Sequence, residues 1–424
     1  MSNDHAQEIV ITGLGVVSPI GIGANAFWDS LVEGRSGIAR VEAFDPAGLP
    51  VQIAGEVRDF DPKAYVQPRK SLKLMERDAQ LSVAAARMAC NDAQLEPGAG
   101  DPDRFGVVFG ADRIRNHLRD STPVYRACVP NGKFDYSLWA SHGMPAMFPL
   151  GFLRVLPNML ASHISIVWDA RGPNNTIHQN EVSALVAMIE AARVIERGMA
   201  DIMITGGACA RMHPLDWVRF TLTRELARDV TQPAAASRPF DQQRQGAVMG
   251  EGAAAFVLEK RRHAEARGAR ILGTLRGGAS ACEPVPKNAK PTGTAVRHAV
   301  ERAARDADLD LADLGHVNAH GTATRHDDAI EAQALAELLN DTPVTALKSY
   351  FGDLSAGGGA VELGGSLLAL SHGLVPATLN YEHPDRDCPI NVVSGAPLEG
   401  TAPSGVVLNH TPVGQAAAVI VTRD

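Results

Sequence analysis

The sequence repeats one pattern: an apolar run with the composition of a β-strand, a glycine-rich turn, and then a helix. In the first half, residues 9–12 lead into Gly13-Leu14-Gly15, and residues 201–205 lead into Gly206-Gly207. Strands that alternate with helices predict parallel or mixed sheets that are covered by helices on both faces. Because the pattern occurs twice in similar order, we expect an α/β fold of two duplicated halves, residues 1–251 and 252–424.

The other elements follow from the spacing of apolar residues. Segments in which apolar residues recur with the helical period are predicted to be helices, and short continuous apolar runs are predicted to be strands. The stretch 123–149 shows neither pattern and contains Pro, Gly and Trp, so we expect it to leave the core at a subunit interface or a cavity mouth. The predicted helices are residues 24–33, 78–93, 182–197, 293–307, 329–339 and 361–374, and the other predicted strands are 105–110, 253–259, 271–278, 317–319, 406–409 and 418–421.

Composition excludes several classes of function. The formal net charge of -8 argues against a nucleic-acid groove and a basic membrane-binding face. No run of 18 apolar residues occurs, and residues 1–9 lack a signal core, so we expect a cytoplasmic protein without a membrane span. The cysteines form no CxxC pair, and no GxGxxG loop follows a strand. The sequence therefore predicts no cofactor and no metal.

Several short motifs carry a resemblance to a known family. They are 10–19 (VITGLGVVSP), Arg171-Gly172-Pro173, 237–241 (SRPFD) with Gly250-Glu251-Gly252, 318–324 (NAHGTAT) and Lys348-Ser349 with Gly352. Together and in this order they resemble the elongating, type II β-ketoacyl-[acyl-carrier-protein] synthases. The resemblance spans nearly the whole chain. It implies a thiolase fold of five layers, αβαβα, a dimer, and an acyl carrier protein as partner.

The family's chemistry needs a cysteine at a strand-to-helix elbow, about nine residues after the Gly-Pro pair. Its thiolate takes the acyl chain, and a thiolate is a good nucleophile when a helix N-terminus lowers its pKa. Two histidines then stabilise the enolate, with a lysine and a glutamate holding the network. Counting from Gly172-Pro173 without a gap places Glu181 at the cysteine position. We therefore expect that ordinary condensation is lost.

The remaining motif positions match in part. His320 corresponds to the first histidine and Lys348 to the lysine, but Asp353 stands where the second histidine belongs. Asp328 and Glu331 follow His320 at the family spacing and are assigned to the supporting network. The glycine-rich gating loop is replaced by residues 409–415 (NHTPVGQ), which include Val413, and Pro412 would stiffen it.

Three functions remain open for the altered site. The chain is either a non-condensing subunit, like the cysteine-less chain length factors that pair with an active synthase, or a pseudoenzyme that pairs with itself. Alternatively, it is an acyl-carrier-protein-dependent malonyl decarboxylase or acyltransferase that uses His320, Lys348 and Glu181. A metal site made by Glu181, His320 and Asp353 is a weaker possibility, since this ligand set occurs at some iron sites.

Structural roles compete with each of these interpretations. Glu181 and Asp353 are each expected to pair with Lys348 or His320, because buried charge is rarely left unpaired. Lys348 and Glu331 are expected to form an ion pair. The other histidines of interest, His178, His326 and His410, are expected to be solvated or hydrogen-bonded loop residues. The five cysteines, Cys90, Cys128, Cys209, Cys282 and Cys388, are expected to be buried and inert.

Overall fold

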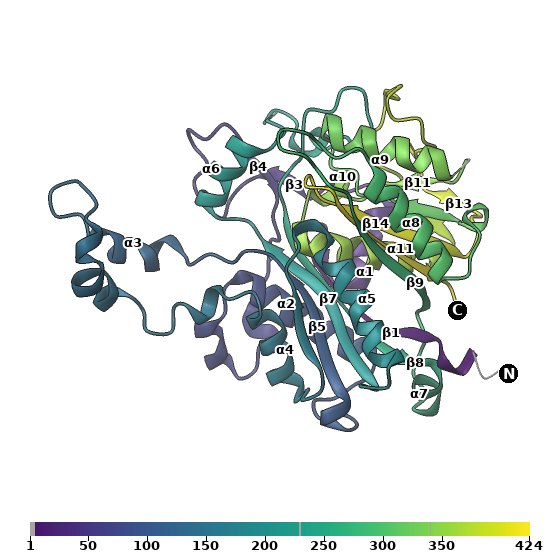
Figure 1. The fold of residues 1–424 in the computed structure, drawn as a ribbon, viewed down its shortest axis with the longest axis horizontal. Coiled ribbons are helices and arrows are strands. Elements are labelled where there is room, and N and C mark those ends of the chain that lie inside the picture. The colour runs from purple at the N-terminus through teal and green to yellow at the C-terminus, as the bar shows by residue number, and fades with distance from the viewer. Residues whose placement is uncertain (1–4, 229, 340) are drawn as a thin grey trace.

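One large sheet runs through the molecule in the computed structural model, which describes residues 5–228, 230–339 and 341–424 (Figure 1). Its strand order is β11-β10-β14-β15-β9-β1-β8-β7-β5-β6, with β2 (Gly21–Ile22) paired to β1. Two runs of five strands make up this order. The first is β1 (Ile9–Ser18), β5 (Phe105–Ala111), β6 (Asn174–Ile177), β7 (Ile202–Ala210) and β8 (Glu251–Lys260), and the second is β9 (Gly273–Cys282), β10 (His316–Asn318), β11 (Val344–Thr345), β14 (Ser404–His410) and β15 (Gln415–Thr422).

The two runs have the same topology. In the first, β6-β5 and β5-β7 are parallel, whereas β7-β8 and β8-β1 are antiparallel. In the second, β11-β10 and β10-β14 are parallel, whereas β14-β15 and β15-β9 are antiparallel. This confirms the expected duplication. The expected division at residues 251–252 falls at the start of β8, whereas the strand order groups β8 with the first five strands.

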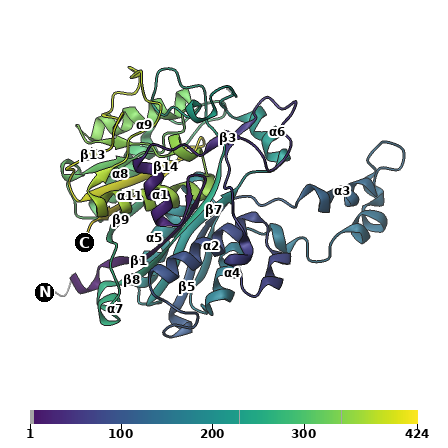
Figure 2. The same cartoon turned by 180° about the vertical axis from the view of Figure 1, so that it is seen from behind.

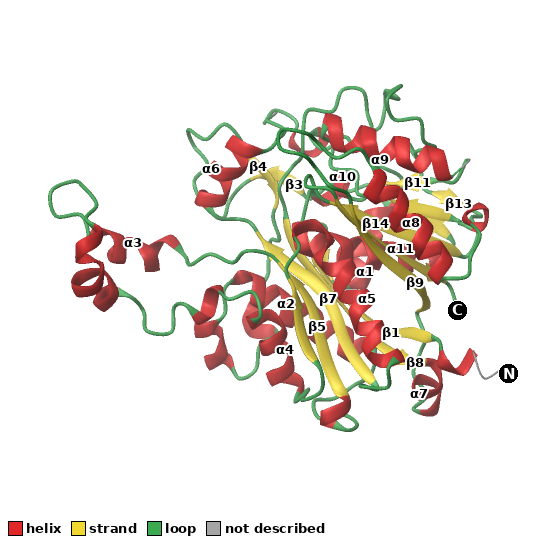
Figure 3. Ribbon diagram, viewed as in Figure 1, coloured by secondary structure: helices red, strands yellow, loops and turns green. Residues whose placement is uncertain are grey.

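Helices cover and separate these two sheet halves, as Figure 3 shows by element type. The helices α2 (Arg77–Asp92) and α4 (Met159–Trp168) pack on the outer face of the first half, and α8 (Thr294–Asp306) and α9 (Arg325–Leu338) on that of the second. Between the halves lie α5 (Ser183–Glu196) and α11 (Gly358–His372), whose apolar residues join one core with both halves. The layers are therefore αβαβα, as the resemblance implied. None of the described helices is long and apolar enough to cross a membrane.

Several element boundaries differ from those expected. The strand β7 continues through Gly206-Gly207 to Ala210 instead of ending there. A Cβ on Gly207 would lie 2.1 Å from the Ala356 carbonyl oxygen, so this glycine permits close packing and is not a turn device. The helices α9 and α11 begin four and three residues early because their first turns hold charged residues and glycines, which show no apolar period.

The segment without periodicity leaves the core, as predicted. It contains α3 (Leu118–Arg126) and several single helical turns up to Val155, and it stands away from the body in both views (Figures 1 and 2). The helix α6 (Pro214–Thr223), which was not predicted, lies toward the same end of the molecule in both views. The other short elements are α1 (Ala24–Val32), α7 (Arg261–Ala266), α10 (Lys348–Phe351), β3 (Ile38–Arg40), β4 (Ile53–Gly55), β12 (Leu374–Val375) and β13 (Leu398–Glu399).

Candidate functional site

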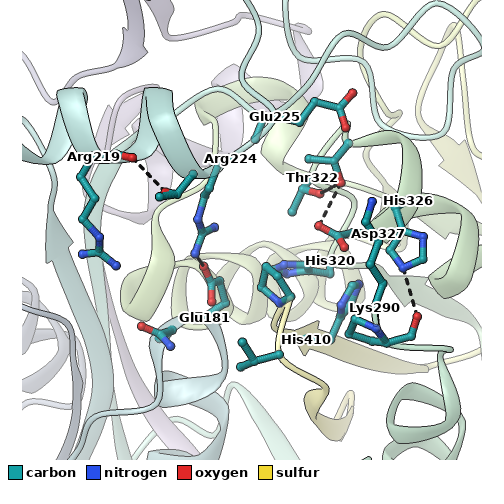
Figure 4. A pocket seen from close by; sticks show the side chains of 17 residues that line it. Glu181, Arg219, Arg224, Glu225, Lys290, His320, Thr322, His326, Asp327 and His410 are labelled. Atoms are coloured by element: carbon teal, nitrogen blue, oxygen red, sulfur yellow. Dashed lines mark hydrogen bonds and ion pairs between the residues drawn. The ribbon is translucent and has the colours of Figure 1, made fainter. Parts of the chain in front are cut away.

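The strand-to-helix elbow places Glu181 at the bottom of a cavity. A single 3-10 turn, Asn180–Val182, joins the end of β6 to α5, and Asn180 adopts the left-handed backbone conformation with φ 51°. The Glu181 side chain is buried at the N-terminus of α5, where the helix dipole favours negative charge. Its Oε1 accepts a hydrogen bond from Arg224 Nη2 at 2.7 Å (Figure 4). The same oxygen lies 3.7 Å from Arg211 Nη2. The expected pairing of Glu181 with Lys348 or His320 is therefore wrong.

Arg211 binds two more carboxylates of the same cluster, those of Asp112 and Asp353. It follows the end of β7 and is buried, with Nη2 2.8 Å from Asp112 Oδ2 and Nη1 3.3 Å from Asp353 Oδ2. Arg224 Nη1 also lies 3.6 Å from Asp353 Oδ2. The Ser355 backbone N–H donates to Asp353 Oδ1 at 2.9 Å. The Asp353 carboxylate thus binds Arg211 and Arg224. Its expected pairing with His320 or Lys348 is wrong.

Burial and the two arginines act in opposite directions on Asp353. Burial alone would raise its pKa, but Arg211, Arg224 and Lys348 overcome this and hold the pKa below its usual value. The Arg211 guanidinium lowers the pKa of Asp112 in the same way, against the effect of burial. Both aspartates are therefore ionised at neutral pH, and an ionised carboxylate at the position of Asp353 can only accept hydrogen bonds.

Phe220 organises the arginines. Its ring lies in the buried face of α6, and the guanidinium carbons of Arg211, Arg219 and Arg224 stand 4.6, 5.0 and 5.2 Å from its centroid. A cation over an aromatic face is attracted by the negative face of the ring. The ring therefore holds three like charges close together beside the carboxylates.

His320 keeps the geometry of a hydrogen-bond donor. Lys348 Nζ lies 3.1 Å from His320 Nδ1, and an ammonium group can only donate, so Nδ1 accepts and Nε2 carries the proton. Burial, together with the charges of Lys348, His410 and Arg224, puts the pKa of His320 well below its usual value. The ring is therefore neutral, and it lines the cavity.

Lys348 pairs with a glutamate that the sequence analysis missed. Its ammonium group forms a short ion pair with Glu362 in α11, and Asn409 Nδ2 donates to the other oxygen of Glu362 at 2.6 Å. The expected Lys348–Glu331 pair is wrong. Instead, Glu331 accepts the backbone N–H groups of His320 at 2.6 Å and of Gly321 at 2.9 Å, and so fixes the turn that carries His320.

Asp328 supports the same turn. It accepts backbone N–H groups from Phe240 at 2.8 Å, Thr322 at 2.9 Å and Ala323 at 3.0 Å. Burial raises its pKa to about 7. Asp328 does not line the cavity, and its carboxylate holds the backbone of the turn that follows His320 in place.

His410 is a buried part of the site and not a solvated loop residue, which corrects the expectation for it. It ends β14, and its ring lies 4.6 Å from that of His320. Although burial opposes protonation, Glu331, whose Oε2 is 3.7 Å from His410 Nε2, holds the pKa of His410 above its usual value. The sequence analysis missed it because residues 409–415 were interpreted only as a gating loop.

A cavity of about 390 Å³ is lined by Glu181, Arg224, His320 and His410, whereas Arg211, Asp353 and Lys348 lie behind its wall (Figure 4). Val413 lies at its mouth with 61% of its surface exposed, so it takes no part in the charged network. His326 also lines the cavity, and its Nε2 is 3.0 Å from the Pro291 carbonyl oxygen. The other lining residues are Asn180, Glu181, Arg219, Thr223, Arg224, Glu225, Ala247, Lys290, Pro291, His320, Thr322, Thr324, Asp327, His410 and Pro412.

Neither a metal nor a cysteine nucleophile fits this arrangement. Among the described residues, no three His, Cys, Asp or Glu side chains are grouped to hold a metal ion. Cys209 lies 3.7 Å from Asp112, but burial raises its pKa well above the usual value, and it does not line the cavity. Cys282 is exposed, contrary to expectation.

Comparison with known proteins decides the family. The sequence model of the β-ketoacyl synthase N-terminal domain matches residues 6–264, and that of the C-terminal domain matches residues 272–382. The chain belongs to the β-ketoacyl synthase family. This ketosynthase homologue is 33% identical over 401 residues to 3-oxoacyl-[acyl-carrier-protein] synthase 2 of Synechocystis sp., covering 93% of each chain. It is also 33% identical to the tetracenomycin polyketide synthase ketoacyl synthase alpha subunit of Streptomyces glaucescens, covering 93% of this chain and 92% of the relative.

Solved structures confirm the thiolase fold of this ketosynthase homologue. A β-ketoacyl synthase from Burkholderia phymatum superposes with a TM-score of 0.88 at 28% identity, covering 99% of this chain and all of the other. The ishigamide ketosynthase/chain length factor superposes with a TM-score of 0.85 at 29% identity, covering 99% of each chain. The charged cluster around Glu181 therefore lies in a complete ketosynthase fold.

Proposed function

We propose that this chain is a non-condensing, chain-length-factor-like subunit of fatty-acid or polyketide synthesis. It acts with an acyl carrier protein and with a ketosynthase that carries the nucleophilic cysteine. The observation that carries this proposal is the ion pair between Glu181 and Arg224, 2.7 Å apart, at the nucleophile position.

The chemistry of the elbow argues against an acyl-enzyme. Attack of Glu181 on a thioester would form a mixed anhydride, which is too reactive to store an acyl chain. The oxygen facing Arg224 is already hydrogen-bonded, which lowers its nucleophilicity. Asp353 adds a negative charge where the family places an enolate-stabilising donor. Both changes act against condensation.

Related solved structures support the choice of partners. One similar structure, at 26% identity and a TM-score of 0.83, is a type II polyketide synthase acyl-carrier protein in complex with its ketosynthase. Another is a ketosynthase/chain length factor. They support an acyl carrier protein and a cysteine-bearing ketosynthase as partners of this chain.

A two-part experiment tests the proposal. The pure chain is incubated with malonyl- and acyl-carrier protein and followed by intact mass spectrometry, and we expect neither an adduct on the chain nor a product. Each cysteine-bearing ketosynthase of the source organism is then purified and added in turn, and we expect one of them to form a complex that makes β-ketoacyl product. An acyl adduct on the chain alone, or product from the chain alone, would overturn the proposal.

Decarboxylation of malonyl-carrier protein is the second candidate. The observation that favours it is the protonated Nε2 of His320 in the cavity that Arg224 also lines. A neutral imidazole donor can stabilise an enolate, and an arginine can hold a carboxylate. Release of acetyl-carrier protein by the chain, lost in His320→Ala and kept in the exposed-residue control His142→Ala, would favour this function over the first.

A further inference from the structure

Two cations that line the cavity have no counter-ion in the protein. They are Arg219 from α6 and Lys290 from the loop before α8. In the part of the chain that the structure describes, neither side chain forms an ion pair or a hydrogen bond. The proposed function uses neither residue, so their charges need a separate explanation.

The carboxylates that line the same cavity each have a hydrogen-bond partner in the protein. Glu181 pairs with Arg224 at 2.7 Å. Asp327 accepts the hydroxyl of Thr324 at 3.0 Å, and Glu225 accepts a backbone N–H at 3.3 Å. The charged groups that are left to bind a ligand are therefore the two cations, and they attract an anion.

The surroundings of Arg219 carry an excess of positive charge. Burial and the charges of Arg113 and Arg115 lower the pKa of Arg219. The carboxylates of Asp216 and Asp112 act in the opposite direction but do not cancel this effect. An anion bound at the Arg219 guanidinium would relieve the repulsion between these arginines.

The free donors of the cavity come from two sides. Figure 4 shows Arg219 and Lys290 at opposite sides, with His320 between them. The protonated Nε2 of His320 is a neutral donor, and it donates to no other described residue. A ligand that binds the donors of both sides needs two separated acceptor groups.

We propose that the cavity binds a free dicarboxylate, with one carboxylate on Arg219 and the other on Lys290 and His320. A guanidinium group can bind a carboxylate through two parallel hydrogen bonds, and an ammonium group binds it as a point charge. The cavity volume of about 390 Å³ lies in the range that holds small ligands. The inference goes beyond the proposed function, because it needs neither a carrier protein nor a ketosynthase.

A bound dicarboxylate would change the access of other ligands to the site. It would lie in front of His320 and fill the cavity that an acyl group on a carrier protein would enter. The free dicarboxylate and the carrier-bound acyl group would therefore exclude each other. In this arrangement the dicarboxylate is an effector of the site and not its substrate.

The test is isothermal titration calorimetry of the full chain at constant ionic strength. The probes are succinate, adipate and suberate, and each is compared with the monocarboxylate of the same carbon number, which is butyrate, hexanoate or octanoate. We expect at least one dicarboxylate to bind about tenfold or more tightly than its monocarboxylate, because cations bind both of its ends.

Two variants and two matched controls locate the binding site. Arg219→Gln and Lys290→Gln each remove one exposed cation of the cavity, and each should weaken binding of the tightest dicarboxylate about tenfold or more. Arg126→Gln and Lys287→Gln remove exposed cations that do not line the cavity, and they should leave the affinity unchanged. Thermal unfolding of every variant verifies that the fold is kept.

Each of the alternative results would overturn the inference. If no dicarboxylate binds, the cavity is not a site for this class of ligand. If every dicarboxylate binds only as tightly as its monocarboxylate, the second cation takes no part. If either cavity variant binds as tightly as the wild-type chain, the ligand is held elsewhere. None of these results measures acyl transfer or complex formation with a ketosynthase, so the proposed function is tested separately.

Discussion

Arg224 and Glu181 meet at the elbow of the ketosynthase fold, where Arg224 Nη2 donates to Glu181 Oε1 at 2.7 Å. The arginine comes from the residue after α6, and the glutamate from the turn before α5. Because the two residues are 43 positions apart, their pairing depends on the tertiary structure and not on a local motif. The position that the resemblance assigns to the nucleophile is one half of an ion pair.

The two buried carboxylates of the site, Glu181 and Asp353, depend on the arginines. A buried carboxylate without a partner costs several kcal/mol, so each must be paired to be kept. Arg211 and Arg224 both face Glu181 and Asp353, and Phe220 lies under both guanidinium groups. The two carboxylates and the two arginines therefore form one interdependent cluster.

Arg211→Met should destabilise the fold strongly. It would leave Asp112 buried without its cation and Asp353 with Arg224 as its remaining arginine, and breaking a buried pair in this way costs about 3–5 kcal/mol. Denaturant unfolding measures the loss. Arg197→Met breaks the exposed pair with Glu190 and should cost under about 1 kcal/mol. Equal losses in the two variants would show that Arg211 does not hold the cluster together.

The sequence predicted the parts of the site that a gapless motif fixes. Glu181, His320, Lys348 and Asp353 were placed by counting from motif residues, and the structure brings all four into one cluster, with Glu181 and Asp353 at Arg224 and Lys348 at His320. The fold followed from the same motifs and from the repeated strand-turn-helix pattern. These features are local, so they can be read along the chain.

The partners of those residues could not be predicted in the same way, because they come from distant elements. Arg211 and Asp112 directly follow β7 and β5, and polar residues after parallel strands were a usable signal for the site. Glu362 is the one acidic residue of the mainly apolar helix α11, which was a second signal. Nothing in the local sequence points to Arg224.

Glu181→Cys should accept an acyl group without condensing it. A cysteine at the N-terminus of α5, near Arg224, would have a lowered pKa and a reactive thiolate. Asp353 would still offer an acceptor where the enolate needs a donor. Intact mass spectrometry should therefore detect an acyl adduct on the variant, and product analysis should find no β-ketoacyl product. Glu181→Ala is the control for non-specific acylation, and recovery of condensation by Glu181→Cys alone would show that Asp353 is not the obstacle.

His410 should make stability depend on pH. The folded-state pKa of His410 is raised by Glu331 and Asp327 against the opposing effects of burial and Lys348, and the His320 ring also faces it. A raised pKa stabilises the fold below the unfolded value of about 6.5, and this contribution is lost as pH rises through the folded pKa.

The measurement is the unfolding free energy of wild type and His410→Gln at about pH 6 and about pH 9. The stability advantage of the wild-type chain should shrink at the higher pH. His142→Gln, at an exposed position, should show no such change. An advantage that grows with pH would mean that His410 is neutral in the folded chain.

Lys348→Met should destabilise the chain. It should also allow His320 to carry its proton on either ring nitrogen. The substitution leaves Glu362 buried without its cation, at a cost of about 3–5 kcal/mol, and removes the donor 3.1 Å from His320 Nδ1. Lys348→Met with Glu362→Met replaces the whole pair by apolar groups and should recover most of that stability. Nitrogen-15 spectra of labelled histidine should show His320 protonated on Nε2 in the wild-type chain and a mixture of tautomers in both variants. A stable double variant that still carries only the Nε2 proton would mean that another group, such as Asn409, sets the tautomer.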